Sequence, residues 1–167
     1  MQYEITAAQL NHFKKEGEIT FESLFDDSVR QVIANHQTGE DLFRKEAKIR
    51  SIVLNPKIGK LIYELIEKRP IRLLYDRIVE KSTIDLNHLS FQGVLIGVLF
   101  PFSENTITFF SVEHPKEIEE PALLVVYGAT NARYVLHEQD PNTARLKKMG
   151  YTYGDRLKTE DFPYIYR

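Results

Sequence analysis

The sequence PALLVVYGATNARYVLHEQDPNTAR, residues 121–145, decides how the fold of this chain is interpreted. It begins with an apolar run that suits a buried strand, reaches Gly128, where we expect a turn, and returns as a second strand ending at His137. A polar turn, EQDPNT, follows, and then Arg145. A histidine at a strand end with an arginine eight residues later could hold a metal and an acidic co-substrate. The same residues could equally form a surface turn.

The composition excludes several classes of function. A chain of 167 residues can bury a substantial core, and we expect one domain over residues 1–167, mainly helical in 1–70 and mainly β-sandwich in 71–167. The formal net charge is −2 with both signs interspersed, which argues against a nucleic-acid partner. There is no cysteine, so disulfides, zinc–thiolate sites and cysteine nucleophiles are excluded. Neither a signal peptide nor a membrane span is recognisable, so we expect a cytoplasmic protein with no membrane partner.

The first part of the chain carries helix signals. Thr6 and Gln9 can form a capping box, in which each side chain satisfies the backbone N–H of the other residue. After Asn55, Pro56 suits the first position of a helix, and apolar residues then recur at helical spacing. The pattern predicts helices over 6–16, from Asp26 or Asp27, from Asp41 as the N-cap, and over 56–69, with a short strand at 19–21.

After Pro70 the pattern changes to strands rich in β-branched and aromatic residues. No helix long enough for a parallel crossover separates them, so an antiparallel arrangement is expected. Helices first and strands after them are typical of an α+β protein, here a β-sandwich or barrel with helices packed outside. The aromatic tail GDRLKTEDFPYIYR should dock on the body. The predicted strands are 71–79, 91–102, 106–112, 122–127, 133–137 and about 148–153.

Few residues are arranged for catalysis. The chain has no nucleophile elbow of the GxSxG type and no glycine-rich phosphate loop. None of the five histidines forms an HxH, HxD, HxE or HExxH pair. His137 stands out because it closes a predicted strand, and Asp76 because it interrupts an apolar strand, where a carboxylate needs solvent, a partner or a metal. A non-haem iron site of the 2-His-1-carboxylate type requires a third ligand.

Five segments, taken in order, resemble the phytanoyl-CoA dioxygenase-like branch of the Fe(II)/2-oxoglutarate oxygenases. They are ITAAQLNHFKKEGEITFESLF (5–25), LLYDRIV (73–79), FQGVLIGVLF (91–100), NTITFFSVEHP (105–115) and HEQDPNTAR (137–145). The resemblance implies N-terminal helices packed on a double-stranded β-helix, or jelly-roll, core. It also implies Asp76 and His137 as ligands of Fe(II), and Arg145 as the residue that binds the far carboxylate of 2-oxoglutarate.

The chain departs from the family where the first histidine ligand belongs, because Leu74 stands there. We therefore expect a divergent, non-catalytic protein that binds a small molecule or a protein partner and holds neither Fe(II) nor 2-oxoglutarate as a cofactor. The alternative is an active Fe(II)/2-oxoglutarate-dependent dioxygenase that uses Asp76 and His137 with a third ligand, for example His88 or His114. A cupin-like isomerase on a similar barrel is a further alternative.

Simple structural roles are also open for the three candidate residues. Asp76 could pair with Arg72 or Arg77, and Arg145 could be a surface charge. His137 could be a turn residue bonded to Asp140 or to a backbone carbonyl. A short jelly roll with small loops exposes sheet edges, so a homodimer that uses the tyrosine-rich tail is a further expectation.

Overall fold

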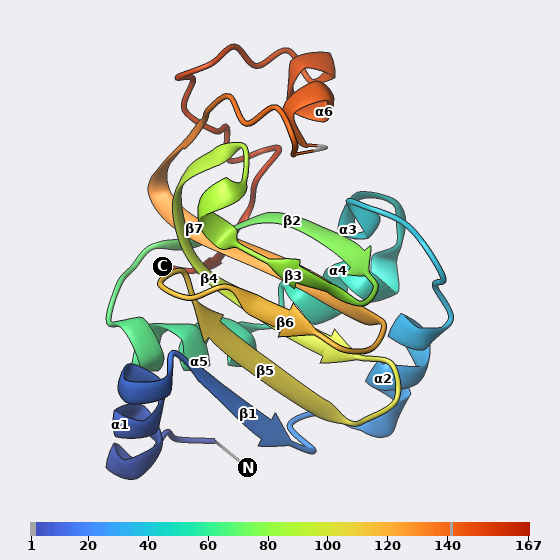
Figure 1. The fold of residues 1–167 in the computed structure, drawn as a ribbon, viewed down its shortest axis with the longest axis vertical. Helices are drawn as coiled ribbons and strands as arrows, with labels where there is room; N and C mark the ends of the chain where they lie inside the picture. The colour runs from blue at the N-terminus through green and yellow to red at the C-terminus, as the bar shows by residue number, and fades with distance from the viewer. Residues whose placement is uncertain (1–2, 141) are drawn as a thin grey trace.

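The computed structural model describes residues 3–140 and 142–167, and its centre is a six-stranded sheet in the order β1-β5-β4-β7-β2-β8. Every neighbouring pair is antiparallel, as expected for strands joined without helical crossovers. Two short strands, β3 and β6, form a separate antiparallel ribbon (Figure 1). The strands are β1 Glu18–Glu22, β2 Ile71–Val79, β3 Ser82–Ile84, β4 Phe91–Pro101, β5 Thr106–Ser111, β6 Lys116–Ile118, β7 Ala122–Tyr134 and β8 Tyr164–Tyr166.

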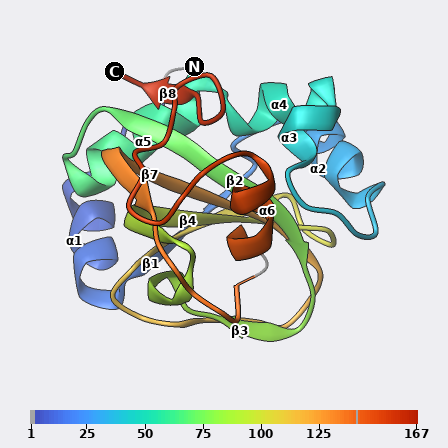
Figure 2. The ribbon, with the colours of Figure 1, turned by 90° about the horizontal axis from the view of Figure 1, so that it is seen from above.

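One face of the sheet, called the helix face below, is covered by the N-terminal helices (Figure 2). The apolar stripe predicted after Asn55 is the buried side of α5, and its members Ile58, Leu61 and Ile62 pack on strand residues of this face. Each such side chain removed from water contributes roughly 1.5–3 kcal/mol. The helices are α1 Ala7–Glu16, α2 Asp27–Ala34, α3 Leu42–Lys45, α4 Ala47–Val53 and α5 Pro56–Ile66.

The opposite face, called the inner face below, carries a second apolar cluster. The β3–β6 ribbon, the 3-10 turn Leu86–His88 and helix α6 (Asn142–Lys148) lie on this side (Figures 1 and 2). Large aromatic side chains fill the cluster, so much of the inner face is packed core. These aromatic residues are Tyr75, Phe91, Phe110, Tyr134, Tyr151 and Phe162.

The C-terminal tail docks on the body, as its aromatic content predicted. Strand β8 pairs with the start of β2, and the ring of Tyr166 stacks on Tyr63 of α5. The fully buried guanidinium of Arg72 fixes the preceding loop by donating to the carbonyl oxygens of Leu157 and Phe162. The tail therefore covers the edge of β2 at its first residues, Ile71 to Leu73, which protects this part of the edge from pairing with another molecule.

The prediction of an α+β fold is confirmed as helices on an antiparallel sheet, but the turn predicted at Gly128 is wrong. Strand β7 runs unbroken from Ala122 to Tyr134, through Gly128. A Cβ atom at Gly128 would lie 2.7 Å from Cδ1 of Leu74 and 3.0 Å from the carbonyl oxygen of Gly93. The glycine therefore serves close packing across the sheet, where the sequence had indicated a chain reversal.

A second correction concerns the strand predicted near residues 148–153. Helix α6 ends at Lys148 and an irregular segment follows it. Leu146 anchors the helix in the inner cluster, and the buried ring of Tyr151 packs there from the loop. The aromatic residues that suggested a strand are thus core residues of a loop. In the part of the chain that the structure describes, no helix has the length and apolar character needed to cross a bilayer.

Candidate functional site: a buried polar cluster beside helix α6

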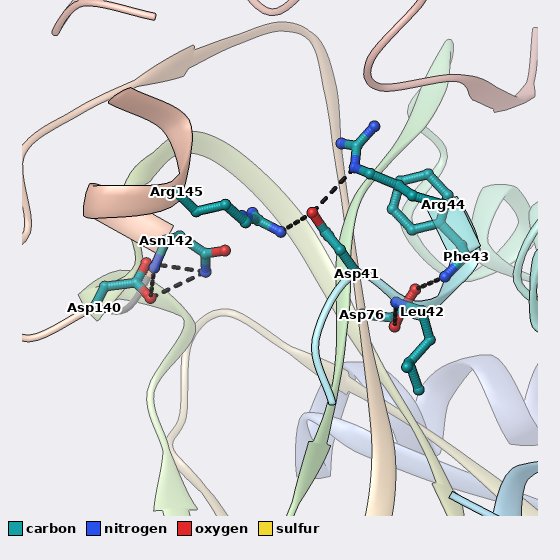
Figure 3. A network of polar contacts seen from close by, with 8 residues as sticks. All are labelled: Asp41, Leu42, Phe43, Arg44, Asp76, Asp140, Asn142 and Arg145. Carbon is teal, nitrogen blue, oxygen red and sulfur yellow. Dashed lines mark hydrogen bonds and ion pairs between the residues drawn. The ribbon is translucent and has the colours of Figure 1, made fainter. Parts of the chain in front are cut away.

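Asp76 caps a helix. Its side chain has 0% exposure, and its two carboxylate oxygens accept the backbone N–H groups of Leu42, at 2.8 Å, and Phe43, at 2.9 Å (Figure 3). These N–H groups belong to the first turn of α3, which has no partners for them within the helix. Asp41 stands at the predicted N-cap position, but its backbone is left-handed and its side chain makes no capping bond, so the capping acceptor is Asp76. The helix predicted from Asp41 is also divided, because the extended Glu46 separates α3 from α4.

A β-bulge in β2 determines where Asp76 points. The register against β7 shifts between Leu73 and Tyr75, so Leu74 is an extra residue in the strand. Leu74 lies in the inner cluster, whereas Asp76 lies opposite Val125, a residue of the helix-face cluster. Two residues two positions apart in a regular strand share a face. Here the bulge places them on opposite faces.

The environment of Asp76 does not suit a metal ligand. Burial raises the pKa of its carboxyl group to about 6, although the N–H donors of Phe43 and Leu42 oppose this rise. Neither Arg72 nor Arg77 pairs with it among the described residues, so that simple role is also wrong. The Asp76 carboxylate accepts two backbone N–H groups on the helix face, and Leu74 has no atom that binds a metal. These residues do not fit the ligand set of Fe(II).

Arg145 lies on α6 and is drawn into the protein. Its side chain is 15% exposed, and its Nη1 pairs with Oδ2 of Asp41. The same oxygen accepts from Nε of Arg44, at 3.0 Å. The guanidinium also lies 5.8 Å from the centre of the Tyr75 ring. The alternative role of Arg145 as a surface charge is therefore wrong. Two arginines from separate helices converge on one carboxylate oxygen (Figure 3).

The polar groups around Arg145 are only partly satisfied. Tyr75 is 1% exposed and Asn142 is 2% exposed, yet each has a polar atom without a partner. Burial raises the pKa of Tyr75 far above its ordinary value, so the group is a neutral hydroxyl donor. Each unsatisfied buried group costs about 1–3 kcal/mol. In residues 3–140 and 142–167, the buried atoms here without partners are Nε and Nη2 of Arg145, Nη2 of Arg44, Nε of Arg77, the Tyr75 hydroxyl, Oδ1 of Asp41 and Oδ1 of Asn142.

The loop between β7 and α6 holds this cluster in place. The carboxylate of Asp140 accepts the backbone N–H of Ser90, at 2.5 Å, and that of Asn142, at 3.1 Å. The Tyr134 hydroxyl donates to the carbonyl oxygen of Thr143, at 2.5 Å. These bonds tie helix α6 to the start of β4 and the end of β7. The position of Arg145 is therefore fixed by the helix that carries it. We name Asp41, Arg44, Tyr75, Asn142 and Arg145 the polar cluster.

His137 lies outside the polar cluster. It follows β7 in a loop, and its Nδ1 is buried without a partner among the described residues. Its ring centre is 5.2 Å from that of His88, whose Nδ1 lies 3.6 Å from Asp85. His137 borders a hollow of about 390 Å³ whose walls are polar and apolar in about equal parts. His114, the other candidate third ligand, instead packs beside Gly17.

The structure thus brings together some of the predicted site residues. The side chain of Asp41 pairs with Arg145, and its backbone N–H donates to the carbonyl oxygen of Asp76. His137 is instead next to His88. Within the described ranges, no three His, Asp or Glu side chains are grouped as metal ligands. Sequence reasoning assigned no ligand-binding role to Asp41, Arg44, Tyr75 or Asn142. The available signal was the polar sequence YDR (75–77) inside an apolar strand, which indicated that buried polar groups need partners.

No family model matches the chain, and no curated protein matches it either. Solved structures show the same fold. SnoK, a non-haem α-ketoglutarate-dependent carbocyclase from nogalamycin biosynthesis, aligns with a TM-score of 0.71 and 14% identity over 96% of each chain. SnoN, a non-haem α-ketoglutarate-dependent epimerase from the same biosynthesis, gives 0.70 and 12% over 96% of this chain and 98% of its own.

A third structure is somewhat more similar in sequence. CT296 from Chlamydia trachomatis is 21% identical, with a TM-score of 0.58 over 77% of this chain and 97% of its own. These likenesses support the oxygenase-like jelly-roll fold that the five segments predicted. Membership of the phytanoyl-CoA dioxygenase-like family stays a prediction. At such low identities the comparisons concern the fold alone, and the chemistry must be argued from this chain's own residues.

Proposed function

We propose that the protein is a divergent, non-catalytic double-stranded β-helix protein of the 2-oxoglutarate-oxygenase type that binds a small organic anion at the polar cluster. The observation that carries the proposal is the excess of buried donors around Arg145. Arg145 and Arg44 share one oxygen of Asp41, and two further donors of Arg145 have no partner among the described residues. A carboxylate that accepted them would form charge-assisted hydrogen bonds, which are the stronger kind.

The non-catalytic part of the proposal rests on the residues that an iron site would need. Leu74 offers no ligand atom on the inner face, and the Asp76 carboxylate caps α3 on the helix face. Moving Asp76 to the inner face would leave two buried N–H groups without an acceptor, at a cost of several kcal/mol. We therefore assign Asp76 to the architecture of the protein and Arg145 to ligand binding.

One observation favours the alternative, an active Fe(II)/2-oxoglutarate-dependent dioxygenase. The ring centres of His88 and His137 lie 5.2 Å apart, and His137 lines a hollow of about 390 Å³. The third ligand would have to be Asp76, which would first have to leave its helix cap. Anaerobic titration with Fe(II) and 2-oxoglutarate tests this alternative. A visible charge-transfer band that disappears in His137→Ala and in His88→Ala would establish an iron site.

Isothermal titration calorimetry of the metal-free protein with 2-oxoglutarate, succinate and citrate tests anion binding. We expect saturable binding of at least one of these acids, and a rise in its Kd of tenfold or more in Arg145→Gln. Arg30→Gln is the matched control, because Arg30 forms an ion pair with Asp27 on α2, away from the polar cluster. Absence of binding by the wild-type protein at millimolar concentrations, or equal effects of the two substitutions, would contradict the proposal.

A further inference from the structure

The carboxylate of Asp41 occupies the position that a bound anion would take. Its Oδ2 accepts from Nε of Arg44, at 3.0 Å, and pairs with Nη1 of Arg145. Arg44 lies on α3 and Arg145 on α6, so the two guanidiniums approach this oxygen from different elements (Figure 3). An incoming carboxylate directed to both arginines would have to displace this side chain.

The backbone of Asp41 is held independently of its carboxylate. The N–H of Asp41 donates to the carbonyl oxygen of Asp76, at 2.7 Å, and the carbonyl oxygen of Gly39 accepts from the N–H of Ile78, at 2.9 Å. Glu40 forms a bridge with Arg77 between these two bonds. The segment therefore stays paired with β2 whichever way the Asp41 side chain turns. The Asp41 side chain can therefore leave the two guanidiniums without breaking these backbone bonds.

Asp41 also leaves buried polar atoms around it without hydrogen-bond partners. Its backbone has φ 52° and ψ 39°, a left-handed conformation that is uncommon for residues other than glycine, asparagine and aspartate. Its Oδ1 has no partner among the described residues although Asp41 is only 5% exposed, and two donor groups of Arg145 are likewise unused. One bidentate carboxylate on the fork of Arg145 would satisfy more donors than Asp41 does.

We propose that Asp41 is an intramolecular substitute for the ligand, which keeps the anion site closed until an external carboxylate replaces it. This inference rests on the proposed function and adds its regulation and ligand class. An acid with one carboxylate can occupy the fork of Arg145 but leaves the Tyr75 hydroxyl without an acceptor. An acid that carries a second oxygen acceptor can satisfy both groups. The site thus selects carboxylates with an additional keto, hydroxyl or carboxyl oxygen.

The test compares the wild type with Asp41→Asn, which keeps the size of the side chain and the tolerance for a left-handed backbone. Calorimetry with 2-oxoglutarate as the probe should show binding at least tenfold tighter in Asp41→Asn, because the competing negative charge is gone. Asp41→Gly, which suits the same backbone conformation, should show the same gain and guards against a fold defect specific to asparagine. Butyrate, which has one carboxylate and no further oxygen, should bind more weakly than 2-oxoglutarate to all three proteins.

The control is Asp27→Asn, which removes the acid of an exposed aspartate–arginine pair on α2 and should leave the Kd unchanged. If the wild type binds 2-oxoglutarate and both Asp41 variants bind it equally well or more weakly, the inference is overturned and the proposed function stands. Binding by none of the proteins would overturn both. Tighter binding in the Asp27→Asn control as well would show a general effect of net charge and would also overturn the role assigned to Asp41.

Discussion

The buried polar groups around Tyr75 and Arg145 on the inner face are less fully hydrogen-bonded than the buried polar groups of the helix face. On the helix face, the carboxylate of Asp76 accepts two N–H groups, and the hydroxyl of Tyr127 donates to the carbonyl oxygen of Val53, at 2.7 Å. On the inner face, Tyr75 is equally buried, but its hydroxyl has no partner among the described residues, and Arg145 beside it uses only part of its donors. Buried polar groups in folded proteins are normally satisfied.

This difference separates polar groups that stabilise the fold from polar groups that could bind a ligand. A carboxylate whose oxygens are all engaged contributes to stability and has nothing left for a ligand. A guanidinium with unused donors weakens the fold and gains when a ligand arrives. The resemblance implied Asp76 as a metal ligand and Arg145 as a ligand-binding residue, and under the proposed function only Arg145 keeps a binding role. The contrast can be tested by substitutions on each face, because the two faces should respond differently in stability.

The largest effect is expected for Asp76→Ala. The substitution removes the cap of α3 and leaves the buried N–H groups of Leu42 and Phe43 without acceptors, so the free energy of unfolding should fall by about 4 kcal/mol. Urea denaturation measures the loss. The matched control is Asp26→Ala, which removes the exposed cap of α2 and should cost about 1 kcal/mol. Equal losses in the two variants would refute a special structural role for Asp76.

Asp76 should also make stability depend on pH. Its pKa is raised to about 6 in the folded protein, from an ordinary 3.8, so the folded state holds the proton more tightly than the unfolded chain. The stability that this group contributes is fully present below about pH 4 and is lost as the pH rises through 6, by roughly 3 kcal/mol. The exposed Asp27 and Asp155 have lowered pKa values, and their contribution instead falls as the pH drops below about 4.

The measurement is the free energy of unfolding of the wild type and of Asp76→Asn between pH 4.5 and pH 7. The difference between the two proteins isolates this carboxyl group, because all other titrating groups are shared. We expect the wild type to lose stability relative to the variant as the pH rises. Parallel curves would mean that the carboxyl group of Asp76 titrates normally.

Introducing a histidine at position 74 tests the consequence of the bulge. Leu74 is fully buried in the inner cluster, so Leu74→His should cost roughly 2 kcal/mol of stability. It should not create an iron site, because Asp76 lies on the other face of the sheet. Leu74→Met, of similar volume, should cost less than about 1.5 kcal/mol and serves as the control. A charge-transfer band with Fe(II) and 2-oxoglutarate in Leu74→His would overturn the assignment of the two faces.

The sequence predicted the parts of this fold that depend on local signals. The capping box of Thr6 and Gln9 forms as expected, Asn55 caps α5 with Pro56 at its start, and β2 has its predicted bounds, Ile71–Val79. Each of these signals lies within a few residues of sequence. The apolar run of β2 is the pattern expected of a strand buried on both faces. The turn expected at Gly128 failed because a glycine can serve packing as well as a chain reversal, and the sequence does not separate the two.

The polar cluster depends on contacts that no local pattern records. Asp41 and Arg145 are 104 residues apart in the sequence, and their pairing follows from how α6 is tied to β4 and β7. The bulge at Leu74 likewise has no signature in the residues around it, although it reverses the side on which Asp76 lies. What the sequence did indicate was that a carboxylate in an apolar strand must have a partner, and the start of α3 is that partner.

The smallest effects come from a matched pair of tyrosines and give the sharpest comparison of the two faces. Tyr127→Phe removes a hydroxyl that donates to Val53 on the helix face, so it should cost about 1 kcal/mol. Tyr75→Phe removes a buried hydroxyl that has no partner among the described residues, so stability should be unchanged or slightly higher. Both side chains are fully buried, so the loss of the same atom is compared in similar surroundings.

Ligand affinity should follow the reverse order. Tyr75→Phe should weaken binding of 2-oxoglutarate severalfold, because the free hydroxyl is one of the donors offered to the anion, whereas Tyr127→Phe should leave the Kd unchanged. Urea denaturation and calorimetry on the two variants measure both quantities. If Tyr75→Phe were the more destabilising change, its hydroxyl would have a partner inside the folded protein. The inner face would then be as fully satisfied as the helix face, and the reason for placing a ligand there would be gone.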